Sequence, residues 1–328
     1  MKKEFWIACL AVCCVGFMFA SLSGPAAGAE EKYPVRPVEC VCAYPAGGYA
    51  DLINRFFAKS LEKYLKVVVV PENKPGGGEV IAATAMANAK PDGYTVGLLA
   101  DGPLVYSPIL GRANDYKDKI AIIAQLICTT QVIAVAADAP WKTFQEFVDH
   151  ARKNPGVIYG HGGMGTASHL RVEYINHVGN LKMKGMPFKG DPEVAAAVLG
   201  KHVEAGIFSY QAAKDQADGG KMRLLFSFTP PGAGPDPTLP TITTFFGKDV
   251  VDILPPSIHF VAPGKTPERI LKILEGVAEK ISRDQEFLNS NKTLYAQVCF
   301  QDTSATKKIL ERKAGEIRPI MQRAGLIK

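Results

Sequence analysis

Two glycine-rich loops carry the residues of this sequence that are best suited to binding chemistry. The first is Tyr44–Asp51, where an apolar run breaks at a proline and two glycines before an amphipathic helix begins. The second is Tyr159–His169, which has the same order of apolar run, glycines and helix start. Backbone N–H groups at a helix start have no partner within the helix and carry partial positive charge, so they bind carboxylates and phosphates. Two such loops in separate halves of the chain predict a clamp for a small anion.

Polar side chains in and beside these loops complete the candidate site. His161 and His169 either contact a ligand carboxylate or order the second loop by hydrogen bonds. Lys189 is the nearest candidate cation, with a solvated loop lysine as the alternative. Asp101, which follows a predicted strand, is expected to repel an anion, to bind an amine group or to face solvent. The predicted ligand-binding residues are Tyr44, Pro45, Ala46, Gly47, Gly48, Tyr49, Asp51, Asp101, His161, Gly163, Gly165, Thr166, Ser168, His169, Phe188, Lys189 and Ser209.

The same residues do not form a catalytic constellation. Ser168 stands beside His169, but adjacent residues rarely face each other, and the sequence shows neither an orienting acid nor a G-x-S-x-G elbow. Residues 160–165 match a dinucleotide fingerprint only loosely, because no acidic residue follows about 20 positions later. The glycines at 76–78 lack the Lys-Ser/Thr of a P-loop. We therefore predict a protein that is not an enzyme and that uses no cofactor.

The first 29 residues predict export. Lys2 and Lys3 precede an uncharged, largely apolar run from Phe5 to Ala20, and Ala27-Gly28-Ala29 supplies a small-x-small cleavage pattern. The apolar run is shorter than the roughly 20 residues that span a bilayer, so a retained anchor is the less favoured interpretation. We expect a signal peptide over residues 1–29, a mature chain that begins at Glu30, and a periplasmic location.

Charge and cysteine content exclude further classes. The net charge of +6 over 328 residues is a mild basic excess without a basic stripe, so nucleic-acid binding is not predicted. Cys40, Cys42, Cys128 and Cys299 remain after the leader, all in apolar, strand-like contexts. Buried thiols are the favoured interpretation for these four, and one disulfide in an oxidising compartment is the alternative. No spacing of His or Cys resembles a zinc site, so no metal is predicted.

The elements that position the two loops alternate between strands and helices. Leu52–Leu65 repeats apolar residues at helical spacing, Val67–Val70 is a short strand ended by a proline, and Thr95–Leu99 is a strand after an alanine-rich helix. This order predicts a parallel sheet with right-handed crossovers, and ligands bind beyond the carboxyl ends of such strands. The pattern restarts at Ile120 and ends with a terminal helix at Ser304–Ala324.

At these residues the chain resembles the substrate-binding proteins of tripartite tricarboxylate transporters, the TctC or Bug family. The resemblance runs from Tyr33 to Ile327 and rests on short motifs that follow one another in family order. These motifs are Tyr33-Pro34 with Arg36-Pro37, Tyr44–Gly48 with Asp51, Glu72–Gly76, Pro91–Thr95, Gly162–Leu170, Pro187–Gly190 and Val261–Pro267.

The resemblance implies an α/β, two-domain periplasmic-binding-protein fold, the type II Venus flytrap, with a hinge of two crossing strands. Domain 1 is then expected over 30–128 plus 257–328, and domain 2 over 129–256. The implied function is capture of a small organic carboxylate between the lobes, followed by delivery to the membrane permease subunits of a tripartite transporter, and we predict a monomer. The alternative is a periplasmic ligand sensor that feeds a two-component system.

The resemblance also assigns roles to the loops. The first loop, Tyr44–Tyr49, would hold one carboxylate through backbone groups and ordered waters, and loops at His161–His169 and Phe188–Gly190 would meet the rest of the ligand. Tyr49 stands where family members usually have a small residue, and together with Phe188 it hints at a planar or bulky acid. Asp101 is a second departure, because that loop usually carries Gly-Thr or similar.

Overall fold

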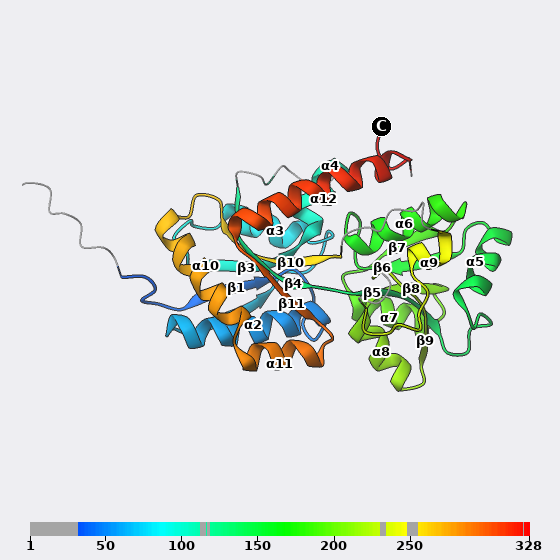
Figure 1. Cartoon of the computed structure of the whole chain (residues 1–328), viewed down its shortest axis with the longest axis horizontal. Helices are drawn as coiled ribbons and strands as arrows, with labels where there is room; N and C mark the ends of the chain where they lie inside the picture. The colour runs from blue at the N-terminus through cyan, green and yellow to red at the C-terminus, as the bar shows by residue number, and fades with distance from the viewer. Residues whose placement is uncertain (1–31, 112–115, 117–118, 230–233, 248–254, 324) are drawn as a thin grey trace, which may run out of the picture. The chain divides into compact units, whose positions relative to one another are not determined.

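The computed structural model describes residues 32–111, 116, 119–229, 234–247, 255–323 and 325–328. The chain divides into two compact units, residues 1–35 and residues 36–328, and every element below belongs to the second. That unit contains two separate β-sheets (Figure 1). We call the six-stranded sheet with its helices the first lobe, and the five-stranded sheet with its helices the second lobe. Within the described residues, no helix combines the length and the apolar character that crossing a membrane requires.

The sheet of the first lobe is mixed, with strand order β11-β4-β10-β3-β1-β2. Its strands are β1 (Val38–Cys42), β2 (Val69–Asn73), β3 (Thr95–Ala100), β4 (Ile120–Cys128), β10 (Ser257–Pro263) and β11 (Gln297–Gln301). Strand β1 pairs in parallel with β2 and β3, as the alternating pattern predicts, whereas β10 runs antiparallel to β3 and β4. The sequence predicts that Pro71 ends β2, but the strand continues through it. Proline is tolerated there because β2 lies at the edge of the sheet.

Helices cover both faces of this sheet. They are α2 (Tyr49–Leu65), α3 (Val80–Asn88), α10 (Glu268–Ser282), α11 (Gln285–Thr293) and α12 (Thr303–Arg323). Figure 1 shows α2 and α11 on one side of the strands, and α3 and α12 on the other. Helix α2 buries Ile53, Phe57 and Leu61 along one stripe, as its spacing predicts. The ring of Phe57 meets that of Phe260 on β10 edge to face, with centroids 4.8 Å apart.

Three short elements of this lobe are not predicted by the sequence. They are the π-helix η1 (Gly102–Tyr106), the single turn α4 (Ser107–Ile109) and α11. Helix α11 is largely polar, so its apolar periodicity is weak, and it is specified instead by its N-cap. There the carboxylate of Asp284 accepts hydrogen bonds from the backbone N–H groups of Glu286 and Phe287.

The second lobe has strand order β7-β6-β8-β5-β9. Its elements are β5 (Gln131–Ala136), α5 (Phe144–Lys153), β6 (Ile158–His161), α6 (Ala167–Gly179), β7 (Lys184–Pro187), α7 (Asp191–Leu199), β8 (Ala205–Ser209), α8 (Tyr210–Asp218), β9 (Met222–Ser227) and α9 (Ile242–Phe246). Successive residues of β5 serve opposite faces of the sheet. Ile133 and Val135 pack into a core with α5 and α6, while Val132 and Ala134 pack into a core with α7 and α8.

The chain passes between the two sheets twice. The first passage is residues 129–130, between β4 and β5, and the second is the segment between β9 and β10. The two passages are bonded to each other, because the N–H of Thr129 donates to the carbonyl oxygen of Pro256 at 2.8 Å. Helix α12 packs on β4, yet Ile317, Ile320 and Met321 near its end join the core of the second lobe. The domain limits given above stay a prediction.

The four cysteines separate into one disulfide and two thiols. Cys128 on β4 and Cys299 on β11 are disulfide-bonded, whereas Cys40 and Cys42 are buried thiols. The interpretation of all four as thiols is therefore wrong for one pair. The bonded cysteines are 171 positions apart in the sequence, and only the antiparallel pairing of β4 with β11 brings them together. Burial raises the pKa of Cys40, which keeps that thiol uncharged.

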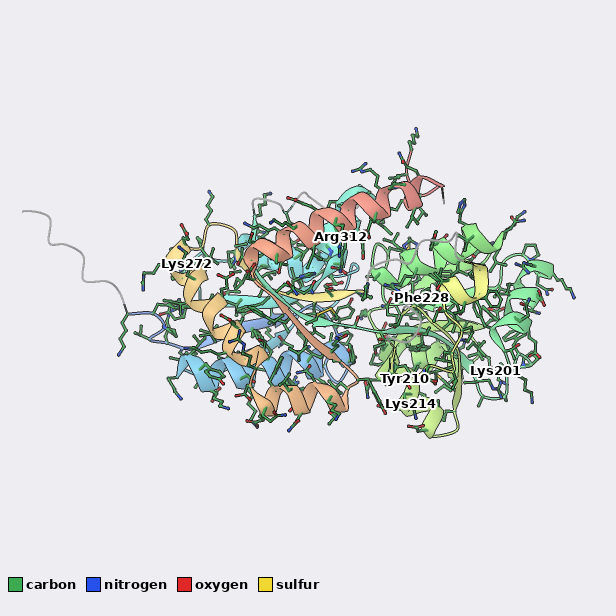
Figure 2. All side chains as sticks on the ribbon, in the orientation of Figure 1. Lys201, Tyr210, Lys214, Phe228, Lys272 and Arg312 are labelled. Atoms are coloured by element: carbon green, nitrogen blue, oxygen red, sulfur yellow. A yellow bond between two sulfur atoms is a disulfide. The ribbon has the colours of Figure 1, made fainter. Side chains whose placement is uncertain are left out.

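Basic side chains lie on the outer surface in local ion pairs. Lys201, Lys214, Lys272 and Arg312 each pair with a nearby carboxylate. Figure 2 shows these four cations at separate places over both lobes. Exposed pairs of this kind contribute about 1 kcal/mol or less to stability. These four basic residues thus lie apart on the surface, and each is balanced by its own carboxylate.

Candidate functional site

A cavity of about 80 Å³ lies where the two lobes meet. From the first lobe it is lined by Tyr44, Pro45, Gly48, Tyr49, Ala50, Glu79 and Ala100. From the second lobe it is lined by Gln131, Gly162, Thr166, Ala167, Ser168, Gly190, Asp191, Pro192 and Ser209. The passages between the lobes and the start of β10 add Thr129, Pro256, Ser257 and Ile258. The carboxyl ends of β1 and β3 thus open onto the cavity, which is where ligands bind in open α/β sheets.

The two predicted glycine loops meet at this cavity. A methyl group added to Gly48 of the first loop would lie 3.7 Å from the ring of Pro192 in the second lobe. A methyl group added to Gly162 of the second loop would lie 4.0 Å from the ring of Tyr44 in the first loop. The first turn of α2 and the first turn of α6 line the same space. Loops 117 residues apart in the sequence, counted from Gly48 to Gly165, therefore belong to one site.

Several glycine amides of these loops are already used by the protein itself. The N–H of Gly47 donates to Asp51 Oδ2 at 2.8 Å, that of Gly162 to Ser168 Oγ at 3.1 Å, and that of Gly165 to His169 Nδ1 at 3.3 Å. Helices α2 and α6 have no side-chain cap, so the N–H groups of their first turns are left for another acceptor. The N–H groups that remain available to a ligand are therefore those of the helix starts rather than those of these three glycines.

Asp51 holds the first loop in shape. It is 1% exposed, and its carboxylate accepts from the side chains of Arg55 and Asn73 as well as from Gly47. Burial by itself would raise the pKa of Asp51, but the hydrogen bonds from Arg55, Gly47 and Asn73 lower it below its ordinary value. Asp51 lies outside the cavity lining, so it stabilises the loop through hydrogen bonds without lining the cavity itself.

The two histidines order the second loop. The rings of His161 and His169 are buried and stacked, with centroids 4.8 Å apart. His161 Nδ1 lies 3.0 Å from the carbonyl oxygen of Gly163, and His169 Nδ1 accepts from Gly165. The hydroxyl of Thr166 donates to Gly163 at 2.7 Å. Neither imidazole lines the cavity, so the loop-ordering role matches these contacts, and ligand contact by the histidines stays a prediction.

The predicted ligand-binding residues divide into two groups. Those that line the cavity are Tyr44, Pro45, Gly48, Tyr49, Thr166, Ser168 and Ser209. Those that lie outside its lining are Ala46, Gly47, Asp51, Asp101, His161, Gly163, Gly165, His169, Phe188 and Lys189. Phe188 packs against the core beneath α7, and Lys189 is exposed with its ammonium 3.8 Å from Glu193. The predicted cation therefore faces solvent in this structure.

Glu79 lines the cavity but is absent from the predicted set. It is the N-cap of α3 with φ +74°, a left-handed conformation that favours glycine, and it follows three glycines. Its side chain turns inward: Oε1 accepts from the Tyr44 hydroxyl at 2.9 Å, and Oε2 accepts from the N–H of Ala100 at 2.7 Å. Burial raises the pKa of Glu79 to about 7. An acid at a helix start usually indicates capping, so the sequence gives no signal for this inward position.

Asp191 is the second cavity acid outside the predicted set. It is the first residue of α7, and its Oδ2 accepts hydrogen bonds from both the N–H and the hydroxyl of Ser209. Burial raises the pKa of Asp191 to about 6. No Lys, Arg or His is among the described residues that line the cavity. The cavity thus combines helix-start N–H donors with two acids and no cationic side chain.

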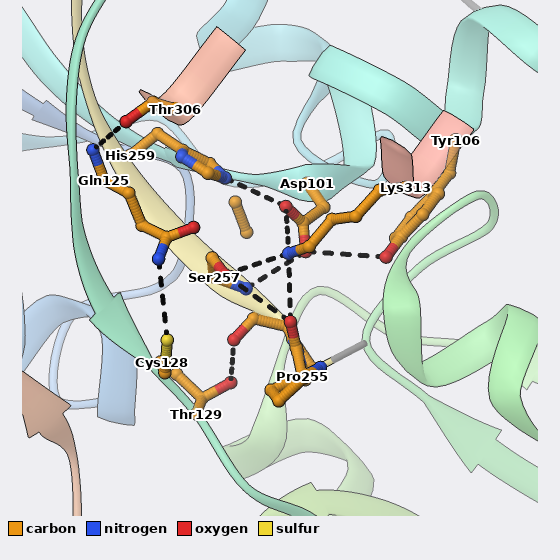
Figure 3. Close-up of polar contacts among 12 residues, drawn as sticks. Asp101, Tyr106, Gln125, Cys128, Thr129, Pro255, Ser257, His259, Thr306 and Lys313 are labelled. Carbon is orange, nitrogen blue, oxygen red and sulfur yellow. Dashed lines mark hydrogen bonds and ion pairs between the residues drawn. The ribbon is translucent and has the colours of Figure 1, made fainter. Parts of the chain in front are cut away.

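Asp101 takes part in a buried charge cluster beside the cavity (Figure 3). Its carboxylate accepts from Lys313 Nζ at 2.8 and 2.9 Å, lies 2.9 Å from His259 Nε2, and accepts from the N–H of Ser257 at 3.0 Å. Lys313 also donates to the carbonyl oxygen of Pro255 at 2.9 Å. Burial alone would raise the pKa of Asp101, but Lys313 and His259 hold it well below its usual value. Asp101 therefore does not face solvent; it fastens the second passage between the lobes to α12.

Comparison with known proteins agrees with this architecture. The profile of the family described as the tripartite tricarboxylate transporter family receptor, TctC, matches residues 53–326. The UPF0065 protein in the gbd 5' region of Cupriavidus necator is 30% identical over 325 residues, which covers 95% of this chain and 98% of that protein.

Solved structures of the same type share the fold. The periplasmic binding protein BugD has a TM-score of 0.80 at 24% identity, covering 90% of this chain and 100% of that one. A Rhodopseudomonas palustris protein solved with adipate has a TM-score of 0.82 at 20% identity, with 90% and 99% covered. MatC from the same species, solved with malate, has a TM-score of 0.77 at 21% identity, with 88% and 99% covered. The predicted two-lobed α/β fold is confirmed.

Proposed function

The chain belongs to the family of tripartite tricarboxylate transporter receptors, and from this premise we propose that it captures a small organic carboxylate in the cavity between its lobes and delivers it to a membrane permease. The family consists of periplasmic binding proteins rather than enzymes, in agreement with the prediction of a binding protein. The predicted leader, residues 1–29, lies outside the described residues.

The observation that carries the proposal is the convergence of two uncapped helix starts on one cavity. The first turns of α2 and α6 come from different lobes, and both line it. A carboxylate placed between them accepts N–H donors from both lobes and lies at the positive ends of both helix dipoles. Because such a ligand contacts both lobes only when they are together, its binding energy favours the closed form.

The lobes are in close contact in this structure. A methyl group added to Gly78 of the first lobe would lie 2.2 Å from the carbonyl oxygen of Met164 in the second, and one added to Gly163 would lie 2.8 Å from Gly78 Cα. Glycine is required at this contact for steric reasons. The cavity of about 80 Å³ is smaller than the ~150 Å³ cavity that admits benzene, which favours a compact aliphatic acid over the planar acid suggested by Tyr49.

Calorimetric titration of the mature protein, unfolded and refolded to remove co-purified ligand, tests the proposal. The panel contains mono- and dicarboxylates of two to six carbons, their hydroxy and amino derivatives, and uncharged amides of the same skeletons. We expect at least one carboxylate to bind with micromolar affinity and its amide to bind at least tenfold more weakly. Binding of no carboxylate, or equal binding of acid and amide, would refute it. Loss of cellular uptake of the bound acid on deletion of the gene would test delivery.

A further inference from the structure

The cavity contains more negative charge than an anion-binding site needs. Glu79 enters it from the first lobe and Asp191 from the second, and no described residue of its lining is Lys, Arg or His. A simple dicarboxylate would bring two more negative charges into this space. Buried charge is unfavourable unless an opposite charge or hydrogen-bond donors compensate it. The starts of α2 and α6 supply donors for one carboxylate, and no cation of the described lining compensates the charge of Asp191.

Asp191 and Gln131 offer hydrogen-bond acceptors on the same side of the cavity. Both hydrogen bonds from Ser209 reach Asp191 Oδ2, and among the described residues none donates to Oδ1. The side-chain oxygen of Gln131 is buried without a donor among the described residues. Gln131 on β5 pairs directly with Ser209 on β8, so their side chains project from the same face of the sheet. Two unused acceptors therefore lie around the Ser209 hydroxyl.

The surroundings of Asp191 favour its ionised form once a cation is present. Asp191 is the first residue of α7, where the helix dipole stabilises negative charge. Its bonded oxygen receives two donors, an N–H and a hydroxyl, which is the environment of a carboxylate rather than of a carboxylic acid. Burial opposes ionisation in the empty cavity and raises the pKa of Asp191 to about 6. A ligand cation would reverse this effect.

We propose that the ligand carries an ammonium group in addition to its carboxylate, and that Asp191 and Gln131 bind the ammonium while Glu79 adds a second negative charge facing it. The proposal rests on the proposed function and names its substrate class: a compact amino acid rather than a simple carboxylic acid. An ammonium has three hydrogen-bond donors and no acceptor. It therefore suits Asp191 Oδ1 and the side-chain oxygen of Gln131, which receive no hydrogen bond from the described residues. The carboxylate of the same ligand occupies the starts of α2 and α6.

Matched ligand sets test the proposal by calorimetry at pH 8. One set is L-aspartate, L-malate and succinate, and the other is L-alanine, β-alanine, L-lactate and propionate. Within a set the ligands share a carbon skeleton and differ in whether they carry ammonium, hydroxyl or hydrogen. We expect the tightest ligand to carry ammonium and to bind at least tenfold more tightly than its ammonium-free counterparts.

Two variants distinguish loss of the ammonium site from a general effect of removing one negative charge. Asp191→Asn retains the shape and an oxygen for Ser209, so we expect it to weaken the amino acid at least tenfold and to leave the ammonium-free acid unchanged or tighter. Asp215→Asn on the exposed face of α8 makes the same change in net charge and is expected to change neither affinity. Lowering the pH from 8 to 5 is expected to weaken the amino acid, because the cavity acids become protonated.

Four results would overturn the proposal. An ammonium-free acid that binds as tightly as its amino counterpart in each set refutes it and leaves the proposed function intact. Affinity that rises towards pH 5 would mean that Asp191 and Glu79 act as neutral donors to a second carboxylate. Binding of no carboxylate in the larger panel refutes the proposed function and this inference together. An Asp191→Asn variant that melts like wild type yet retains the preference for ammonium would exclude Asp191 as the binding residue.

Discussion

Asp101 and Glu79 are two buried carboxyl groups at the same end of β3, and they differ in how their charge is compensated. Asp101 follows the last residue of the strand and faces Lys313 and His259. Glu79 accepts from the N–H of that last residue, Ala100, and from the Tyr44 hydroxyl, and among the described residues no cation pairs with it. Burial is nearly complete for both, yet the pKa of Asp101 is well below its usual value and that of Glu79 is raised to about 7.

Charge compensation, rather than burial, distinguishes the carboxylate that stabilises the fold from the carboxyl group that lines the cavity. A buried carboxylate with its own ammonium completes the fold and needs nothing further. A buried carboxyl group without a cation, in a cavity, is unfavourable in the empty protein and becomes favourable when a ligand supplies the opposite charge.

The largest effect is expected from the cation of the Asp101 cluster. Lys313→Met leaves Asp101 buried without its ammonium, so we expect the free energy of unfolding to fall by about 3–5 kcal/mol. Urea unfolding followed by circular dichroism measures this. Lys272→Met on α10, where the side chain is exposed and pairs with Glu268, should change it by less than about 1 kcal/mol. Similar losses in the two variants would show that the buried cluster contributes no more than a surface pair.

Glu79→Gln should change the pH dependence of stability. The folded protein binds the Glu79 proton more tightly than the unfolded chain does, since its pKa is about 7 instead of 4.5. This proton therefore stabilises the fold at acidic pH, and the contribution is lost as pH rises from 4.5 to 7, by about 3 kcal/mol in all.

Unfolding curves at pH 5 and pH 8 measure this difference without ligand. The variant should gain stability relative to wild type at pH 8, because it lacks the uncompensated charge. Glu193→Gln, an acid on α7 outside the cavity lining, is the control and should follow the wild-type pH dependence. Parallel curves for wild type and Glu79→Gln would contradict the expectation.

Gly78→Ala should impair lobe closure. Gly77 and Gly78 both have φ +62°, so alanine at either position adds the same backbone strain of about 1–2 kcal/mol. Only at Gly78 does the new methyl group overlap the second lobe, at Met164. We therefore expect Gly78→Ala to weaken ligand binding by about 10- to 100-fold by depopulating the closed form. Gly77→Ala should bind like wild type in calorimetry, and equal affinities in the two variants would argue against the closed contact.

Tyr44→Phe should give the smallest effect. It removes one hydrogen bond to Glu79 and so destabilises the fold by about 1 kcal/mol. The hydroxyl lowers the pKa of Glu79 by stabilising the charged form, so its loss should raise that pKa further. The free energy of unfolding of Tyr44→Phe is compared with that of Tyr44→Phe/Glu79→Gln at a series of pH values. The midpoint of the pH-dependent difference between the two variants reports the pKa of Glu79 without the Tyr44 hydroxyl. A midpoint below that of wild type would show that Tyr44 does not donate to the carboxylate.

Much of the local structure was predictable from the sequence. The helix after the first loop, the strand Thr95–Ala100 and the terminal helix Thr303–Arg323 lie where the sequence pattern places them. The two loops were predictable because proline and glycine break an apolar run just before a helix start. Each loop follows a strand of a different sheet, β1 and β6, so their convergence depends on how the two lobes meet.

The charges of the site could not be predicted in the same way. Asp101 pairs with Lys313, which is 212 positions away, and Glu79 accepts from Tyr44, which is 35 positions away. No local pattern distinguishes an inward Glu79 from an ordinary helix cap, because the difference lies in a single backbone conformation. Asp191 shows the same limit: an acid at a helix start is normal, and only the approach of Pro192 to the first loop places Asp191 at the cavity.

The alternation of strands and helices and the two loops that start α2 and α6 follow from the residues alone, because they depend on short-range periodicity, turn residues and helix-start chemistry. Contacts between distant segments pair Lys313 with Asp101, place Glu79 and Asp191 at a cavity whose described lining has no Lys, Arg or His, and bond Cys128 to Cys299. Charge compensation and disulfide pairing depend on distances between residues far apart in the chain, and these distances exist only after the two sheets have formed and met.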